Sequence, residues 1–171
     1  MFAPNTPMVL TDVTFTTETI DEETRRIVVC TFNIVPFTAA QADDLHVRNV
    51  LFDSTTGQPK EAIATIVLYV DMPLQQMTFA MAPDQTDVRI VIQDVKIEPK
   101  VRAKIKQDRE PLMVDATVQV SFHYPTAAEL MYIANGVNDT HYMTFEPVQR
   151  DLLDDGPLLG EELRPGVFAQ H

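Results

Sequence analysis

Alternation of apolar and polar residues with a period of two runs through most of this chain, and it constrains the fold more than any other feature. Successive side chains of a β-strand point to opposite faces of a sheet, so the alternation predicts strands with one buried and one exposed face. Turn-forming stretches such as DSTTGQP and QDREP separate the alternating segments. These segments are residues 9–20, 25–35, 62–70, 75–82, 87–97, 100–106, 112–124 and 141–148.

The number and spacing of these segments predict the fold class. The first two flank the charged residues 21–24, which predicts an antiparallel hairpin with those residues at its tip. About eight short strands with regular turns are typical of a β-sandwich or a rolled antiparallel sheet. The chain has 171 residues, and we expect one mainly β domain over residues 1–148. Residues 149–171 contain five acids, three Gly and two Pro, and they are expected to form an acidic C-terminal tail.

Two short helices are predicted between the strands, within residues 35–53 and 123–139. Each begins with a Thr that is followed three residues later by Gln or Glu, namely Thr38 with Gln41 and Thr126 with Glu129. This spacing is that of a capping box, in which the two side chains bind the first free backbone N–H groups of a helix. The residues expected on the buried faces are Val47, Val50 and Leu51 in the first helix, and Leu130, Ile133, Ala134 and Val137 in the second.

The composition limits the partners and the compartment. The formal net charge is −12, which would repel the phosphates of duplex DNA and of anionic membranes, so neither is expected as a partner. Cys30 is the only cysteine, so no internal disulfide and no thiolate metal site can form. Neither a signal peptide nor an apolar run of about 20 residues is found. These features predict a cytoplasmic protein.

Residues suited to catalysis do not form a recognisable pattern, and we expect a protein that is not an enzyme, with no cofactor and no bound metal. The four histidines show no i, i+2 or i, i+4 pair, the spacings that place two ligands on one metal. His123 and His141 flank the second helix and could meet in space, or they could be two partly exposed residues at strand ends. Cys30 alternates with Val28 and Phe32, which predicts a packing role on the inward face.

Basic residues are concentrated in residues 96–109, which hold six of the thirteen Lys and Arg residues. Alternation predicts that one strand face carries four of these residues, namely Lys100, Arg102, Lys104 and Lys106. One interpretation is an edge strand, because charged residues protect the edges of sheets against aggregation. The other is a contact surface for an acidic protein, for the acidic tail of the chain or for a nucleic-acid backbone, although this strand has no aromatic residue for base stacking.

A short motif opens the tail. Gln149, Asp151, Leu152 and Leu153, with Arg150 between the first two, are similar to the pentapeptide by which many proteins bind the bacterial replication sliding clamp. In that pattern a Gln amide and two adjacent apolar side chains bind at a hydrophobic pocket. The resemblance implies that the tail docks on a clamp. In the alternative interpretation, the two leucines pack back on the domain.

Together these features predict a module for protein–protein interaction. The first hypothesis is a non-enzymatic adaptor or inhibitor, of the kind that phages and other mobile elements encode, which docks on a host replication factor such as the sliding clamp through its tail. The second hypothesis is a structural component of a virion or another homo-oligomeric assembly, in which the basic strand meets an acidic surface of a neighbouring copy.

Overall fold

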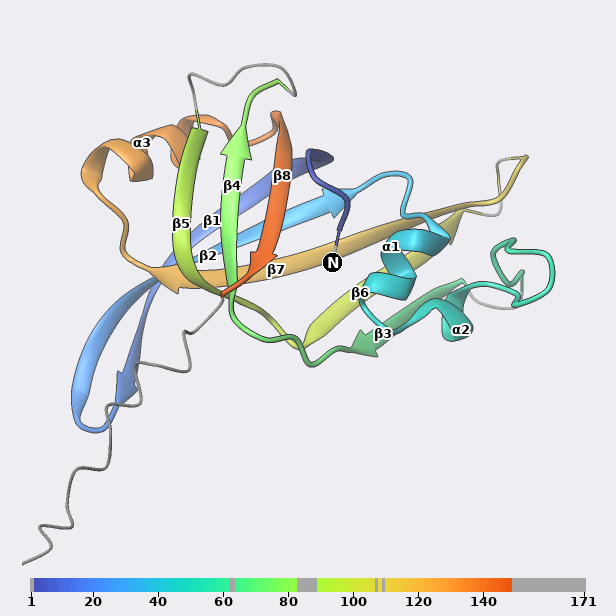
Figure 1. The fold of residues 1–171 in the computed structure, drawn as a ribbon, viewed down its shortest axis with the longest axis horizontal. Helices are drawn as coiled ribbons and strands as arrows, with labels where there is room; N and C mark the ends of the chain where they lie inside the picture. The colour runs from blue at the N-terminus through green and yellow to red at the C-terminus, as the bar shows by residue number, and fades with distance from the viewer. Residues whose placement is uncertain (1, 62–63, 83–88, 107, 109, 149–171) are drawn as a thin grey trace, which may run out of the picture.

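A computed structural model describes residues 2–61, 64–82, 89–106, 108 and 110–148. Eight strands and three short helices make up this part of the chain, which confirms the mainly β class (Figure 1). In order they are β1 (Thr6–Ile20), β2 (Glu23–Ile34), α1 (Ala39–Asp44), α2 (Arg48–Leu51), β3 (Thr65–Tyr69), β4 (Gln75–Ala80), β5 (Arg89–Ile97), β6 (Lys100–Lys106), β7 (Met113–His123), α3 (Ala127–Asn135) and β8 (Thr140–Pro147).

The strands form one antiparallel sheet that rolls up and closes on itself, as the rolled-sheet prediction required. The hydrogen-bonded order is β2-β1-β8-β4-β5-β7-β6-β3, and an additional pairing of β2 with β7 closes the ring. The closing pair extends from Ile27 opposite His123 to Ile34 opposite Ala116. Each of the ring strands β2, β1, β8, β4, β5 and β7 therefore pairs with two others, although β5 meets β7 only at Lys96 and Ile97.

Strands β6 and β3 extend the sheet beyond the ring. β5 and β6 follow one another along the same edge of β7, where Ile97 pairs with Val120 and Arg102 pairs with Thr117. Between them the N–H of Glu98 donates to the carbonyl of Gln119 at 2.8 Å. Pro99 follows, which has no N–H to donate. The chain can therefore leave the ring at this point and continue as β6, against which β3 pairs.

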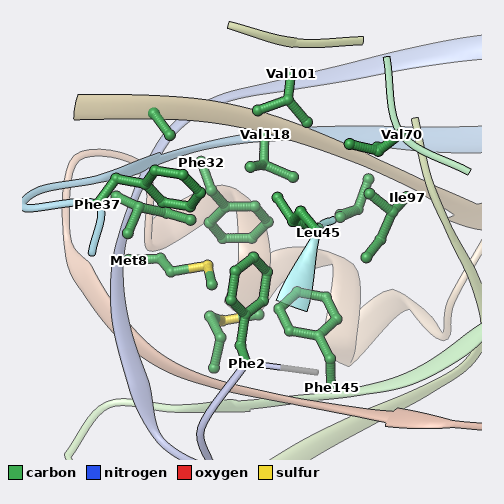
Figure 2. Packing of buried hydrophobic residues seen from close by; sticks show 14 of the residues in the cluster. Phe2, Met8, Phe32, Phe37, Leu45, Val70, Ile97, Val101, Val118 and Phe145 are labelled. Carbon is green, nitrogen blue, oxygen red and sulfur yellow. The ribbon is translucent and has the colours of Figure 1, made fainter. Parts of the chain in front are cut away.

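The core fills the inside of the ring and continues beneath β6. Figure 2 shows Phe2, Phe32 and Phe145 pointing into one interior together with Leu45, which comes from the end of α1. The rings of Phe2 and Phe145 meet edge to face at 5.9 Å between centroids. The inward side chains of β6 also join this core, namely Val101, Ala103 and Ile105. The helices α1, α2 and α3 and the ring thus contribute to one hydrophobic cluster.

Both predicted capping boxes are present. In α3 the backbone N–H of Glu129 donates to Thr126 Oγ1 (3.3 Å), and the Glu129 carboxylate accepts from the backbone N–H of Thr126 (2.8 Å). Thr38 and Gln41 make the corresponding pair before α1. The first predicted helix is nevertheless two short ones, because His46 adopts a positive φ of 59° that ends the helical path after α1.

Two residues predicted on buried helix faces are exposed. Val50 in α2 is 40% exposed, and Ala134 in α3 is also exposed, so both predictions were wrong. The one-turn length of α2 leaves it too short to present an extended apolar stripe, and α3 contacts the core through Ile133, with Leu130 and Val137 partly buried. Among the described residues, no helix is long and apolar enough to span a membrane.

Candidate interaction surfaces

The β1–β2 hairpin projects from the ring as an arm, which we define as residues 14–26. β1 pairs with β8 only from Thr6 to Val9, and the ladder between β2 and β7 begins at Ile27, yet β1 and β2 stay paired as far as Ile20 opposite Glu23. Figure 1 shows this hairpin extending away from the other elements. The exposure of the arm agrees with this view, since its described side chains are all exposed.

The end of the arm is acidic. Its turn consists of two residues, Asp21 and Glu22, whose φ angles of 50° and 68° are those of a type I′ turn that suits the twist of a hairpin. The turn is therefore shorter than the predicted tip of residues 21–24, because Glu23 and Thr24 pair with β1. We call residues 18–25 the acidic tip, because they contain four carboxylates and one Arg. That residue, Arg25, pairs with Glu23 at 3.1 Å, and both side chains are largely exposed.

An aromatic cluster lies at the base of the arm. The rings of Phe15 and Tyr124 are 5.8 Å apart, and the Arg26 guanidinium lies 6.0 Å from the centre of the Tyr124 ring. Phe15 pairs with Val28, so it continues the inward face of the hairpin beyond the end of the core. Nearly half of its surface is exposed, at 47%. The arm thus carries an apolar surface outward instead of ending where the core ends.

The basic strand is not an edge strand. β6 pairs with β7 on one side and with β3 on the other, so the edge-protection interpretation of its lysines was wrong. The backbone N–H and C=O groups of β6 are used in the sheet, and its alternating basic residues project from an outer face that the ring does not need for packing. Their concentration there calls for another explanation.

Three of the four predicted basic residues are available on this face. Lys106 pairs with Asp115 at 2.6 Å, and both side chains are partly buried. Lys100, Arg102 and Lys104 are exposed, and no carboxylate of the described residues lies within 4.0 Å of them. The sheet therefore presents three adjacent cations that form no ion pair in the described part of the chain, although Asp115 of β7, which is paired with Lys106, lies opposite Lys104.

Apolar side chains of β3 lie beside these cations. Tyr69 pairs with Lys100 and Val67 pairs with Arg102, and they are 73% and 45% exposed. Within the described residues β3 pairs only with β6, so its other edge is open. We call Lys100, Arg102, Lys104, Val67 and Tyr69 the basic face. The sequence did not reveal the apolar members, because the pairing of β3 with β6 joins segments about 35 residues apart.

The two surfaces lie at opposite ends of β7. The residues of β7 beside β6 are Met113 to Thr117, whereas His123 pairs with Ile27 at the base of the arm. Eight residue steps from Asp115 to His123 span about 26 Å, and four steps from Ile27 to Glu23 add about 13 Å, at about 3.3 Å per residue. Figure 1 shows the arm and the β3–β6 extension pointing in different directions.

The two histidines that flank α3 have different environments. His141 is fully buried in β8, between the rings of Phe79 and Tyr132, so the prediction of partial exposure was wrong for this residue. His123 is exposed at the end of β7, and β7 does not pair with β8. Alternation with Met143 and Phe145 was the signal that could have identified His141 as an inward residue.

The contacts of His141 are structural. Its Nε2 lies 2.8 Å from the carbonyl oxygen of Gly136, which can only accept, so Nε2 donates the hydrogen bond. Nδ1 has no hydrogen-bond partner among the described residues. No group of three or more His, Cys, Asp or Glu side chains suited to a metal ion occurs in the described ranges.

Cys30 is buried on the inward face of β2, as predicted. Burial, with a smaller contribution from the charge of Asp12, raises the pKa of its thiol to about 12. The thiol therefore stays protonated at neutral pH, in agreement with a packing role.

The tail motif lies outside the described residues, so Gln149, Asp151, Leu152 and Leu153 remain a prediction. The described chain ends at Val148, whose N–H donates to the carbonyl of Leu74 at 3.1 Å. The motif therefore begins directly after a residue that is bonded to the ring.

Compared with protein-family models, with curated proteins and with solved structures, the chain matches none of them. Arguments about function therefore rest on the surfaces described above.

Proposed function

We propose that this protein is a non-enzymatic structural component of a homo-oligomeric assembly of the kind found in virions, and that its arm binds a neighbouring copy. The observation that carries this proposal is the extension of β1 and β2 beyond the ring. None of the arm side chains whose burial is described is buried in the core, so the stability of the monomer does not explain them.

The physical chemistry of the arm supports a contact with another molecule. An isolated two-stranded hairpin is only marginally stable in water, and both of its outer edges carry unpaired backbone groups. The exposed pair of Phe15 and Tyr124 would gain free energy on burial, at about 25 cal/mol per Å² of apolar surface removed from water. A neighbouring copy that covers the arm would supply both the burial and the missing strand partners.

The mass of the protein in solution, with and without the arm, tests the proposal. The arm can be shortened by removing the two opposite pairs Glu18–Arg25 and Thr19–Thr24, which keeps the turn and the alternation of faces. We expect light scattering to show a defined oligomer for the full-length chain and a monomer for the shortened chain, with the same thermal midpoint for both at high dilution. A full-length chain that stays monomeric at all concentrations would refute the proposal.

An adaptor role is a second proposal, and the position of Val148 supports it. The backbone of Val148 is bonded to Leu74, and the motif that resembles a clamp-binding peptide follows directly after this residue. A segment in this position can reach a partner without any change in the sheet. A pull-down from bacterial lysate with the full-length chain, beside a Leu152→Ala/Leu153→Ala variant, tests whether a sliding clamp is captured through these leucines.

A further inference from the structure

We propose that the acidic tip of one copy binds the basic face of the next copy, so that the copies associate head to tail. This inference rests on the proposed homo-oligomeric function and names the two surfaces that would meet. It makes the basic face the receptor for the arm, in place of a nucleic acid or an unrelated protein.

Charge complementarity favours another copy as the occupant of the basic face. With a formal net charge of −12, two copies repel each other in most orientations. The face around Lys100, Arg102 and Lys104 is a local exception, because these three residues form no ion pair in the described chain and Asp115, which lies opposite Lys104, is already paired with Lys106. The acidic tip offers Glu18, Asp21 and Glu22, for which no ion pair is found in the described structure, to a surface with an excess of positive charge.

The shapes and the apolar groups of the two surfaces are also compatible. The arm is a narrow hairpin whose outer backbone edges pair with no other described strand, and the outer edge of β3 beside the basic face is open in the same sense. Exposed Tyr69 and Val67 provide an apolar area next to the cations. A hairpin placed along β3 could pair with its edge while its carboxylates approach the basic residues of β6.

The contact must be intermolecular. The acidic tip and the basic face of one molecule are about 40 Å apart along β7 and the arm, by the same estimate of about 3.3 Å per residue. Two different surfaces of each copy are then used, which makes the interface heterologous. Such an interface repeats from copy to copy and produces a ring if the rotation closes, or a filament if it does not.

Charge-reversal variants provide the experiment. The arm variant is Glu22→Lys/Glu23→Lys, which leaves Asp21 in the turn, and the face variant is Lys100→Glu/Arg102→Glu. The control is Asp139→Lys/Glu146→Lys, which changes two exposed carboxylates outside both surfaces. Masses are measured by light scattering and analytical ultracentrifugation, and circular dichroism checks that each variant is folded.

We expect each variant alone to be monomeric, with the dissociation constant of the contact raised at least about a hundredfold, while the control keeps the mass of the wild type. An equimolar mixture of the two variants should assemble again with the variants alternating, because the reversed tip of one meets the reversed face of the other, and the unaltered tip and face form the wild-type contact. A chain that carries both pairs of substitutions should assemble again.

Other outcomes overturn the inference in distinguishable ways. If the shortened arm abolishes assembly but both charge variants keep the wild-type mass, the homo-oligomeric function stands and the head-to-tail contact is refuted. If the wild type itself is a monomer at all concentrations, both proposals fail.

Binding of a labelled single-stranded oligonucleotide tests the alternative that a nucleic-acid backbone occupies the basic face. Binding that the face variant loses while its mass is unchanged would assign the basic face to a nucleic-acid backbone and refute the contact with the arm. Absence of binding by the wild type, together with monomeric variants, is the result that we expect.

Discussion

Replacing Gly136 with alanine should destabilise the ring through one buried contact. A Cβ at this position would lie 2.5 Å from Cε1 and 2.6 Å from Nε2 of His141, far inside the usual contact distance. The His141 ring cannot move aside freely, because it is buried between Phe79 and Tyr132 and its Nε2 donates to the Gly136 carbonyl. The backbone itself would accept alanine, since φ of Gly136 is −87°.

The expected magnitude follows from these contacts. Overpacking of a well-packed core costs about 1–3 kcal/mol, and a displaced ring would also lose a hydrogen bond worth about 1 kcal/mol. Reduced freedom of the unfolded chain offsets roughly 0.4–1 kcal/mol. We therefore expect the free energy of unfolding to fall by about 2–3 kcal/mol, a decrease in the thermal midpoint of roughly 5–10 °C for a domain of this size.

Urea unfolding followed by circular dichroism measures this effect, and a double-mutant cycle with His141→Ala identifies its cause. Once the ring is removed, the same Gly136→Ala substitution should change the free energy of unfolding by less than about 0.5 kcal/mol, because nothing remains for the new methyl group to displace. An equal loss with and without His141 would refute the steric explanation and place the effect in the backbone at the end of α3.

Three further predictions concern other parts of the chain. Thr126→Ala should lower the stability by about 1 kcal/mol in urea unfolding, whereas Thr126→Ser, which keeps the hydroxyl of the helix cap, should cost less than half as much. Because its thiol has a pKa of about 12 and is buried, Cys30 should resist iodoacetamide at pH 8 in the folded protein and react completely in denaturant, as mass spectrometry would show; fast labelling of the folded chain would contradict its burial. Deleting residues 149–171 should leave the thermal midpoint unchanged if the tail binds elsewhere, and a large decrease in calorimetry would mean that Leu152 and Leu153 pack on the domain.

Local sequence signals predicted most of the secondary structure. All eight strands lie within or close to the alternating segments, and the Thr-initiated caps at Thr38 and Thr126 formed as expected. These features depend on neighbours in the sequence, either through the two-residue period of a strand or through the three-residue spacing of a cap. The break after α1 was missed, because no Gly or Pro marks the positive φ of His46.

Pairing between distant strands could not be predicted in the same way. Alternation in residues 100–106 correctly indicated which side chains of β6 face outward, but it contains no information about the strands on either side. The interior position of β6 and the closure of β2 on β7 depend on contacts between segments far apart in the chain. The arm had a signal in its composition: β1 has 15 residues, well beyond the usual five or six, and residues 13–20 include four Thr and one Glu.

The closure of β2 on β7 also sets an order of events during synthesis. β1 and β2 are adjacent in sequence and can form their hairpin as soon as they leave the ribosome, but β7 begins about eighty residues after β2 ends. Synthesis proceeds at about 5–20 residues per second, so roughly 4–16 s pass before β7 can pair with the second edge of β2. During this time the inward side chains Val28, Cys30 and Phe32 of β2 lack that neighbour. A nascent chain of this protein therefore carries an uncovered, β-prone edge through nearly half of its translation, the kind of exposed edge that favours aggregation.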